Sequence, residues 1–158
     1  NSYDFKSYNK WINENIASLN FYVASANSLT GKDVKLSDRL FLPSSKLRGF
    51  ENGKIGPKDG TDYIGGNYAM SFNISTTLPQ ILPNSQNTDF GLFIDTGNVW
   101  GVDFHPSNLG GSKIRSSAGV SLDYFSPIGP INFSWAKAIT KGQNDVTEFF
   151  RFNLGTTF

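Results

Sequence analysis

Residues 68–78 read Tyr-Ala-Met-Ser-Phe-Asn-Ile-Ser-Thr-Thr-Leu, and bulky side chains alternate with small polar ones along the stretch. Successive side chains of a β-strand point to opposite faces of a sheet, so this alternation predicts a strand with one apolar and one polar face. The apolar register holds Tyr68, Met70, Phe72, Ile74, Thr76 and Leu78, and the polar register holds Ala69, Ser71, Asn73, Ser75 and Thr77. We therefore expect the two faces to meet different surroundings.

The same alternation recurs on both sides of this stretch and predicts about seven antiparallel strands. Their approximate ranges are 2–12, which is the weakest, 17–23, 68–78, 90–97, 114–125, 131–136 and 147–158. The charged side chains on the polar register are Asp95, Arg115, Asp123 and Arg151. Lys137 and Glu148 depart from it. Both lie close to a loop, where a charge on a lipid-facing surface costs roughly 0–1 kcal/mol.

The predicted connections alternate in length. They are tight turns at 13–15 and 126–130, a short link at 79–87, a long loop at 29–65, and further loops at 101–112 and 141–146. Short turns at one end and longer loops at the other are typical of outer-membrane β-barrels, whose bacterial forms have an even number of strands from about eight upward. We therefore predict an all-β fold, an antiparallel transmembrane β-barrel of which this chain supplies one part.

Composition excludes several other classes of protein. The 158 residues carry a formal net charge of +1 and contain no cysteine. The near-neutral balance offers no basic field for nucleic acid, and the lack of cysteine excludes a disulfide framework and cysteine metal sites. No apolar run approaches the roughly 20 residues of a transmembrane helix. The chain starts at Asn1 without a signal-peptide pattern, so we expect a segment cut from a longer protein.

Patterns for catalysis and metal binding are also missing. His105 is the single histidine and precedes Pro106 in a loop, without the partners of a catalytic triad. Gly110-Gly111 leads into a predicted strand and lacks the continuation of a phosphate-binding loop. We predict that the protein is not an enzyme and that it has no cofactor, no metal site and no nucleic-acid partner.

Three motifs, in this order, resemble the BamA-like family of outer-membrane insertases. The stretch Leu47-Arg48-Gly49-Phe50, followed by Ile55-Gly56-Pro57, is similar to the family's RGF loop motif. The stretch Phe93-Ile94-Asp95-Thr96-Gly97-Asn98-Val99-Trp100 resembles the family's F-x-D-x-G-x-V-W strand. The stretch Ser126-Pro127-Ile128-Gly129-Pro130-Ile131 resembles the turn that leads to the family's final strand. The resemblance covers essentially the whole chain.

The resemblance implies a domain organisation. Residues 1–158 would form the C-terminal part of a single barrel domain and supply about the last seven of the family's sixteen strands. The long loop at about 29–65 would fold into the barrel lumen. The earlier strands and the periplasmic POTRA domains would be absent from this chain.

A loop folded into a lumen needs an anchor, and the first motif provides one. Arg48 offers a planar fork of donors that suits a carboxylate, Gly49 permits a tight backbone, and Phe50 can fill an apolar notch. Asp95, on the polar register, is the natural acceptor. The family's motif arginine meets acidic residues on the inner wall, but this chain has Asn73 where the insertase branch often has Glu. Asp95 is therefore the principal expected partner of Arg48.

The C-terminal segment combines two predicted roles. Phe158 suits the aromatic girdle found at strand ends. By resemblance, Phe152, Asn153, Gly155 and Phe158 also form a β-signal, the terminal tag that the assembly machinery reads on outer-membrane proteins. Gly155 weakens the strand and permits bending. In the family this strand pairs poorly with the first strand of the barrel and forms a lateral gate.

The predicted function is that of an insertase, which folds and inserts other outer-membrane proteins without covalent chemistry. The expected partners are unfolded outer-membrane protein clients, the lipid bilayer and accessory assembly lipoproteins. The expected location is the bacterial outer membrane, with the C-terminus on the periplasmic side, and an organelle homologue is a variant of this interpretation. The alternatives are a TamA-like or two-partner secretion barrel of the same superfamily, a passive porin-type channel, and a soluble β-sandwich that buries the apolar face of 68–78.

Overall fold

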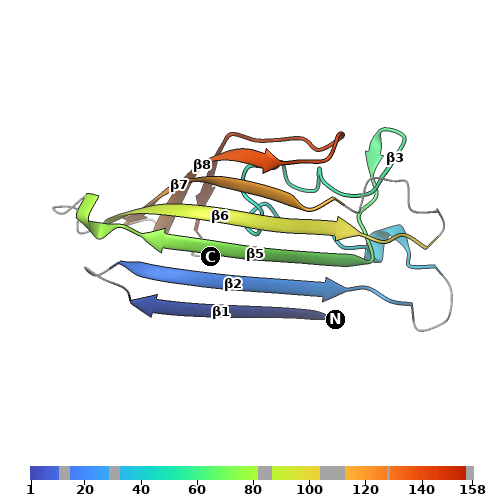
Figure 1. The fold of residues 1–158 in the computed structure, drawn as a ribbon, viewed down its shortest axis with the longest axis horizontal. Helices are drawn as coiled ribbons and strands as arrows, with labels where there is room; N and C mark the ends of the chain where they lie inside the picture. Colours follow the sequence, from blue (N-terminus) through green and yellow to red (C-terminus); the bar gives the residue numbers. More distant parts are fainter. Residues whose placement is uncertain (11–14, 29–32, 82–86, 104–112, 128, 156–158) are drawn as a thin grey trace.

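The computed structural model describes residues 1–10, 15–28, 33–81, 87–103, 113–127 and 129–155. These residues form a sheet of seven antiparallel strands. The strands are β1 (Ser2–Lys10), β2 (Ile16–Ser25), β5 (Tyr68–Thr77), β6 (Thr88–Trp100), β7 (Arg115–Ser126), β8 (Gly129–Thr140) and β9 (Phe150–Leu154). They lie side by side in chain order (Figure 1), as expected for part of an up-and-down barrel. Two two-residue strands, β3 (Lys58–Asp59) and β4 (Asp62–Tyr63), form a separate hairpin in the long loop.

Helical structure in the described ranges is limited to two short 3-10 turns, Leu36–Asp38 and Pro79–Ile81. None of the helices in this part of the chain is long or apolar enough to cross a lipid bilayer.

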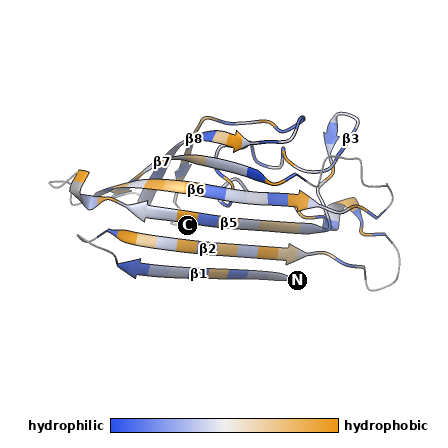
Figure 2. Cartoon of the chain, in the orientation of Figure 1, coloured by the Kyte–Doolittle hydropathy of each residue, from blue (hydrophilic) through white to orange (hydrophobic). Residues whose placement is uncertain are grey.

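The two faces of the sheet have opposite characters, as the alternation predicts. On β6, Ile94 has 52% of its surface exposed, whereas the adjacent Asp95 is completely buried. The same exposed apolar register includes Leu19, Phe21, Val23, Phe72, Ile74 and Leu92. Hydrophobic and hydrophilic residues therefore alternate along β2, β5 and β6 (Figure 2). A soluble protein would bury its apolar register, so the exposed apolar face indicates a lipid-facing surface.

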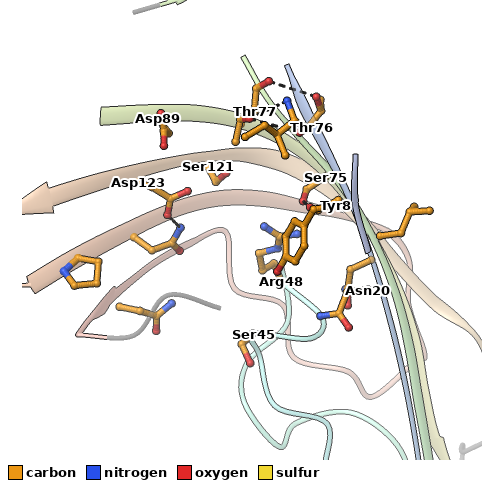
Figure 3. Close-up of a pocket in the computed structure, with 18 of the residues that line it drawn as sticks. Tyr8, Asn20, Ser45, Arg48, Ser75, Thr76, Thr77, Asp89, Ser121 and Asp123 are labelled. Carbon is orange, nitrogen blue, oxygen red and sulfur yellow. Dashed lines mark hydrogen bonds between the residues drawn. The ribbon is translucent and has the colours of Figure 1, made fainter. Parts of the chain in front are cut away.

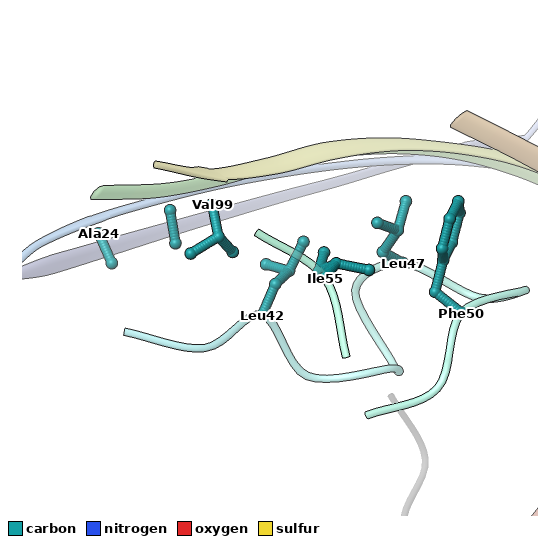
Figure 4. Packing of buried hydrophobic residues seen from close by; sticks show 7 residues of the cluster. Ala24, Leu42, Leu47, Phe50, Ile55 and Val99 are labelled. Atoms are coloured by element: carbon teal, nitrogen blue, oxygen red, sulfur yellow. The ribbon is translucent and has the colours of Figure 1, made fainter. Parts of the chain in front are cut away.

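The long loop between β2 and β5 covers the polar face. Its side chains Leu42, Leu47, Phe50 and Ile55 form a buried cluster against small side chains of the sheet (Figure 4). Those sheet residues are Ala24, Ala69 and Val99. The buried apolar core is thus made by a loop packed on a sheet and not by two sheets packed together.

The final strand is shorter than the predicted range 147–158. Regular pairing covers Phe150–Leu154 only, Phe149 lies in a bend, and Thr147 pairs instead with Phe50 of the loop. Gly155 follows with a positive φ of 84°, which ends the extended conformation. Residues 156–158, and with them Phe158, lie outside the described residues, as do His105 and Ile128.

The two charges that departed from the polar register have different surroundings. Lys137 is exposed on β8 and pairs with Ala118, next to a shift of the β7–β8 register between Ser116 and Ser117. Glu148 is half-buried and forms an ion pair with Arg151, whose side chain lies on the polar register. Glu148 is therefore not a lipid-facing charge, because the bend at Phe149 interrupts the alternation.

A charge placed on the exposed apolar face tests whether it contacts lipid. We expect Ile94→Lys to lower the free energy of unfolding in lipid vesicles by about 2–4 kcal/mol, because Ile94 lies in the middle of β6. The control Ile94→Leu keeps the volume and should change it by less than about 1 kcal/mol. Denaturant titration of the folded protein measures both, and equal stabilities would show that this face does not meet lipid.

Candidate functional site

The centre of the site is an ion pair between the long loop and the inner wall. Arg48 donates from Nε to Asp95 Oδ2 at 2.7 Å and from Nη2 to Asp95 Oδ1 at 2.8 Å. The backbone N–H of Arg48 also donates to Asp95 Oδ2 at 3.0 Å. The pair is therefore bidentate and charge-assisted, the strongest arrangement that these two side chains can form.

Burial makes this pair consequential. The Asp95 side chain is completely buried, and the Arg48 side chain is 19% exposed. The Arg48 guanidinium also lies over the ring of Phe93, 3.4 Å from its centroid. A buried carboxylate without a cation would be strongly unfavourable, so Asp95 holds the loop at one position along β6.

Neighbouring strands bind the backbone of the same loop segment. Asn73 on β5 donates from Nδ2 to the Lys46 carbonyl at 2.8 Å, and the Ser117 hydroxyl on β7 donates to the Arg48 carbonyl. Asn73 thus takes part in the site through an uncharged contact, at the position where the insertase branch of the family often has Glu. The polar register of three consecutive strands supplies these contacts, which is why it is buried rather than solvated.

Gly49 and Phe50 meet different requirements. Gly49 has a φ of 87°, and a Cβ atom there would lie 3.1 Å from the Cβ atoms of Ala136 and Ser117. Both the backbone conformation and the close approach therefore favour glycine. Phe50 is 2% exposed and belongs to the buried cluster beneath the loop. The residues predicted as the loop anchor, Arg48, Gly49, Phe50 and Asp95, are brought together in one place.

A second ion pair, not predicted from the sequence, extends the contacts to β1. Lys46 donates to Asp4 at 2.6 Å, and its Nζ lies 4.3 Å from the centroid of the Tyr22 ring. Residues 46–51, which we call the anchor segment, therefore cross the inner face from β1 to the residues that precede β9. Asp4 lies in the weakest predicted strand, so its sequence gave no sign of this role.

A third ion pair, also missed, is more deeply buried. Arg115 on β7 donates to Asp145 at 2.8 and 2.9 Å, and the two side chains are 1% and 2% exposed. Arg115 also donates to Asn98 on β6, and Asp145 accepts from the Gly142 N–H. Arg115 was placed correctly on the polar register, but nothing in the sequence separates Asp145 from an ordinary solvated loop residue.

The predicted residues of the terminal strand do not form one cluster. Phe152 is exposed on the apolar face, Asn153 lines a cavity on the inner face, and a Cβ atom added to Gly155 would have no atom within 4 Å. The β8–β9 register pairs Phe133 with Phe152 and Asn132 with Asn153. Phe158 lies outside the described residues, so the fourth predicted member is not placed.

Beside the anchor segment lies a cavity of about 340 Å³, and most of the residues that line it are of polar types (Figure 3). Its walls include Tyr8, Asn20, Arg48, Asp89, Asp123 and Asn153. Among the described residues no three His, Cys, Asp or Glu side chains gather as metal ligands would. Polar side chains on the inner wall are typical of the lumen of a transmembrane barrel.

At the other end of the loop, Tyr63 donates from its hydroxyl to the Asn144 carbonyl. Burial, together with the nearby negative charges of Asp145 and Glu51, raises the pKa of Tyr63 above its ordinary value. The hydroxyl therefore stays protonated and remains a donor at neutral pH.

Comparison with known proteins identifies the family. The model of the Omp85 superfamily domain matches residues 2–158. The chain belongs to the Omp85 superfamily. This Omp85 chain is similar to the outer membrane protein assembly factor BamA of Neorickettsia risticii, with 31% identity over 132 residues, which are 82% of this chain and 18% of that protein. It is also similar to a SAM50-like protein of Schizosaccharomyces pombe, with 32% identity over 89% of this chain and 31% of that protein.

A solved structure is similar to the Omp85 chain as well. The crystal structure of BamA from Haemophilus ducreyi lacking POTRA domains 1–3 matches with a TM-score of 0.86 and 28% identity, over 96% of this chain and 33% of that chain. The Omp85 chain therefore spans a third or less of the length of these relatives. The predicted all-β barrel fold and the resemblance to BamA-like proteins are confirmed, and the sheet here is a part of such a barrel that does not close.

Replacement of Asp95 by Asn tests the main ion pair. We expect Asp95→Asn to lower the free energy of unfolding by about 3 kcal/mol, the lower end for breaking a buried pair, because Arg48 keeps some access to water. Asp123→Asn is the matched control, since Asp123 accepts from Asn132 but forms no ion pair in the described structure. It should cost less than about 1 kcal/mol. Equal losses of unfolding free energy in the two variants would mean that the ion pair contributes no more to stability than an ordinary hydrogen bond.

Replacement of Asp145 by Asn tests the pair that the sequence did not reveal. Arg115 and Asp145 are both almost completely buried, so we expect Asp145→Asn to cost about 3–5 kcal/mol. Asp59→Asn, in the exposed β3–β4 hairpin, is the control and should have little effect. The measurement is again denaturant unfolding in lipid, and a loss below about 1 kcal/mol would contradict the predicted importance of this pair.

Proposed function

We propose that this chain is the barrel part of a protein that folds and inserts other outer-membrane proteins in a bacterial outer membrane. The observation that carries the proposal is the short pairing of the terminal strand, because β9 pairs with β8 over five residues whereas β8 is twelve residues long. The other edge of β9, like the outer edge of β1, is one end of the part of the barrel that this chain supplies. The names of the relatives, an outer membrane protein assembly factor and a SAM50-like protein, support the same function.

The proposed mechanism uses backbone hydrogen bonds. When the edge of β9 is not paired with the first strand of the complete barrel, its N–H and C=O groups would have no partner in lipid, where each such group costs several kcal/mol. A strand of an unfolded client can satisfy these groups by β-augmentation. The client's next strand then pairs with the one already bound. No covalent bond is made or broken, so we propose that the protein is not an enzyme.

The ion pair between Arg48 and Asp95 has a supporting role in this mechanism. A strand that accepts clients at its edge must keep its position while its partner changes. The anchor segment binds β1, β5, β6 and β7 on the inner face, and this fixes the curvature of the wall beside β9. Arg48, Gly49, Phe50 and Asp95 are therefore proposed to stiffen the wall and not to contact the client.

The finer features are proposals of the same kind. The edge of β9 would form a lateral gate with the first strand of the complete barrel. Residues Phe152, Asn153, Gly155 and Phe158 would form a β-signal, with the C-terminus on the periplasmic side. The partners would be unfolded clients, the bilayer and accessory assembly lipoproteins, and the earlier strands and POTRA domains would belong to the rest of the protein. The alternative within the superfamily is a TamA-like or two-partner secretion barrel.

Charge reversal at Arg48 in the full-length protein tests the proposed function. We expect Arg48→Glu to reduce the assembly of other outer-membrane barrels by at least about tenfold, because it places two carboxylates together in a buried site. Arg48→Lys keeps the charge but loses the bidentate fork, so its effect should be intermediate. The measurement is the yield of folded client barrels in cells that depend on the variant.

The control is Lys54→Glu, which makes the same charge change at an exposed position of the same loop. Each variant must first be shown to reach the membrane in normal amounts. Unchanged client assembly in Arg48→Glu would contradict the stiffening role. Normal barrel assembly combined with loss of a secreted soluble protein would favour the secretion alternative.

A further inference from the structure

The residues that lead into the terminal strand form backbone hydrogen bonds with the loop. The Glu148 N–H donates to the Gly49 carbonyl at 3.1 Å, and the Glu51 N–H donates to the Val146 carbonyl at 3.0 Å. The Val146 N–H donates to the Lys54 carbonyl at 3.1 Å. Phe50 and Thr147 face each other between these bonds as an antiparallel pair. A short two-stranded ladder therefore joins the loop to residues 146–148.

The same residues could continue the hairpin between β8 and β9. Strand β8 runs to Thr140 and pairs with β7 from Gly129 to Thr140. Its pairing with β9 reaches only Trp135 and Phe150, and one further bond joins the Ala136 N–H to the Phe149 carbonyl. If the register continued, Ala138 would lie opposite Thr147. The loop pairs with residue 147 instead, so β8 and the residues before Phe149 do not pair with each other.

Side-chain positions show that the alternation of faces is interrupted at this point. Phe149 is 68% exposed, although it has the same parity as Arg151 and Asn153 on the inner face. Glu148 instead turns inward and pairs with Arg151. The bend at Phe149 therefore turns the backbone of the residues before it away from β8. The backbone N–H and C=O groups of Val146 and the N–H of Glu148 point toward the loop instead.

The loop lies between the two parts of the opened hairpin. Gly49 sits so close to the inner face of β8 that a Cβ atom there would be 3.1 Å from the Cβ of Ala136. Ala138, the expected partner of Thr147, packs against the buried cluster that contains Phe50. Asp145, the residue directly before Val146, is held close to β7 by its buried ion pair with Arg115. These contacts together favour the open arrangement.

We propose that the Gly49–Lys54 part of the loop is a wedge that competes with β8 for residues 146–148 and thereby limits the length of the terminal strand. With the wedge in place, β9 pairs with β8 over five residues only. When the wedge withdraws, residues 146–148 pair with β8 and the terminal strand lengthens. Under the proposed function, the loop would in this way determine how firmly the client-binding strand is attached to the rest of the wall.

A disulfide trap in the full-length protein measures this competition directly. The described chain contains no cysteine, and Ala138→Cys with Thr147→Cys places a thiol on each strand at positions that meet only when the hairpin closes. Oxidation in lipid vesicles, followed by mass spectrometry of the linked peptide, gives the closed fraction. In the otherwise unaltered protein we expect little linkage.

The wedge is released with Glu51→Pro, which removes the N–H that donates to Val146. We expect the closed fraction to rise by about fivefold, the factor that corresponds to the loss of one backbone hydrogen bond. The matched control is Glu51→Ala, which changes the same exposed side chain but keeps the N–H, and it should leave the closed fraction unchanged. Amide exchange of residues 146–149 provides a second readout without cysteines and should change only in Glu51→Pro.

Two results would overturn the inference. One is ready linkage in the otherwise unaltered protein, which would show that the hairpin is closed despite the loop. The other is equal linkage and equal amide exchange in Glu51→Pro and Glu51→Ala, which would show that the ladder does not hold the segment. Both readouts are structural and independent of client assembly. A failure of the proposed function, seen with Arg48→Glu, is therefore distinguishable from a failure of the wedge.

Discussion

The structure depends on one buried carboxylate, Asp95, and on the arginine that neutralises it. Most proteins bury apolar side chains and expose polar ones, but here the apolar register of the sheet faces outward and the polar register faces the loop. Packing alone would not position a loop on such a polar wall, because apolar contacts have little direction. A bidentate ion pair has both distance and angle requirements. It therefore fixes the loop at one place on β6, and the apolar cluster of the loop packs in register around it.

The remaining contacts of the anchor segment follow from that placement. Once Arg48 is held on β6, Lys46 reaches Asp4 on β1 and Gly49 reaches the surface of β8. A single short segment thus crosses most of the described wall. Such a crossing connection keeps distant strands of the sheet in a fixed relation. This accounts for the concentration of special residue types, an arginine, a glycine and a buried phenylalanine, in three consecutive positions.

The terminal strand belongs to the same set of contacts and not to the sheet alone. Phe150–Leu154 pair with β8, but the residues before them pair with the loop. The alternation of inward and outward side chains is interrupted at Phe149. The weak attachment of β9 is thus a consequence of where the loop lies. Placement of the loop by Asp95 and the incomplete pairing of the last strand are two results of one arrangement, which connects the inner wall to the edge at which the proposed function takes place.

The sequence by itself determined the strands and their two faces. Period-two alternation is a local property, so β5, β6, β7 and β8 were predictable from neighbouring residues. The pairing of Arg48 with Asp95 was predicted from the polar register of Asp95 together with the resemblance of the loop motif to its family. Tertiary structure alone decided the partners of Asp4 and Asp145 and the bend at Phe149, which shortened the predicted final strand. These features arise from residues about 30 to 100 positions apart that compete for the same surface. No local pattern records such a competition, because its outcome depends on where the loop is held in space.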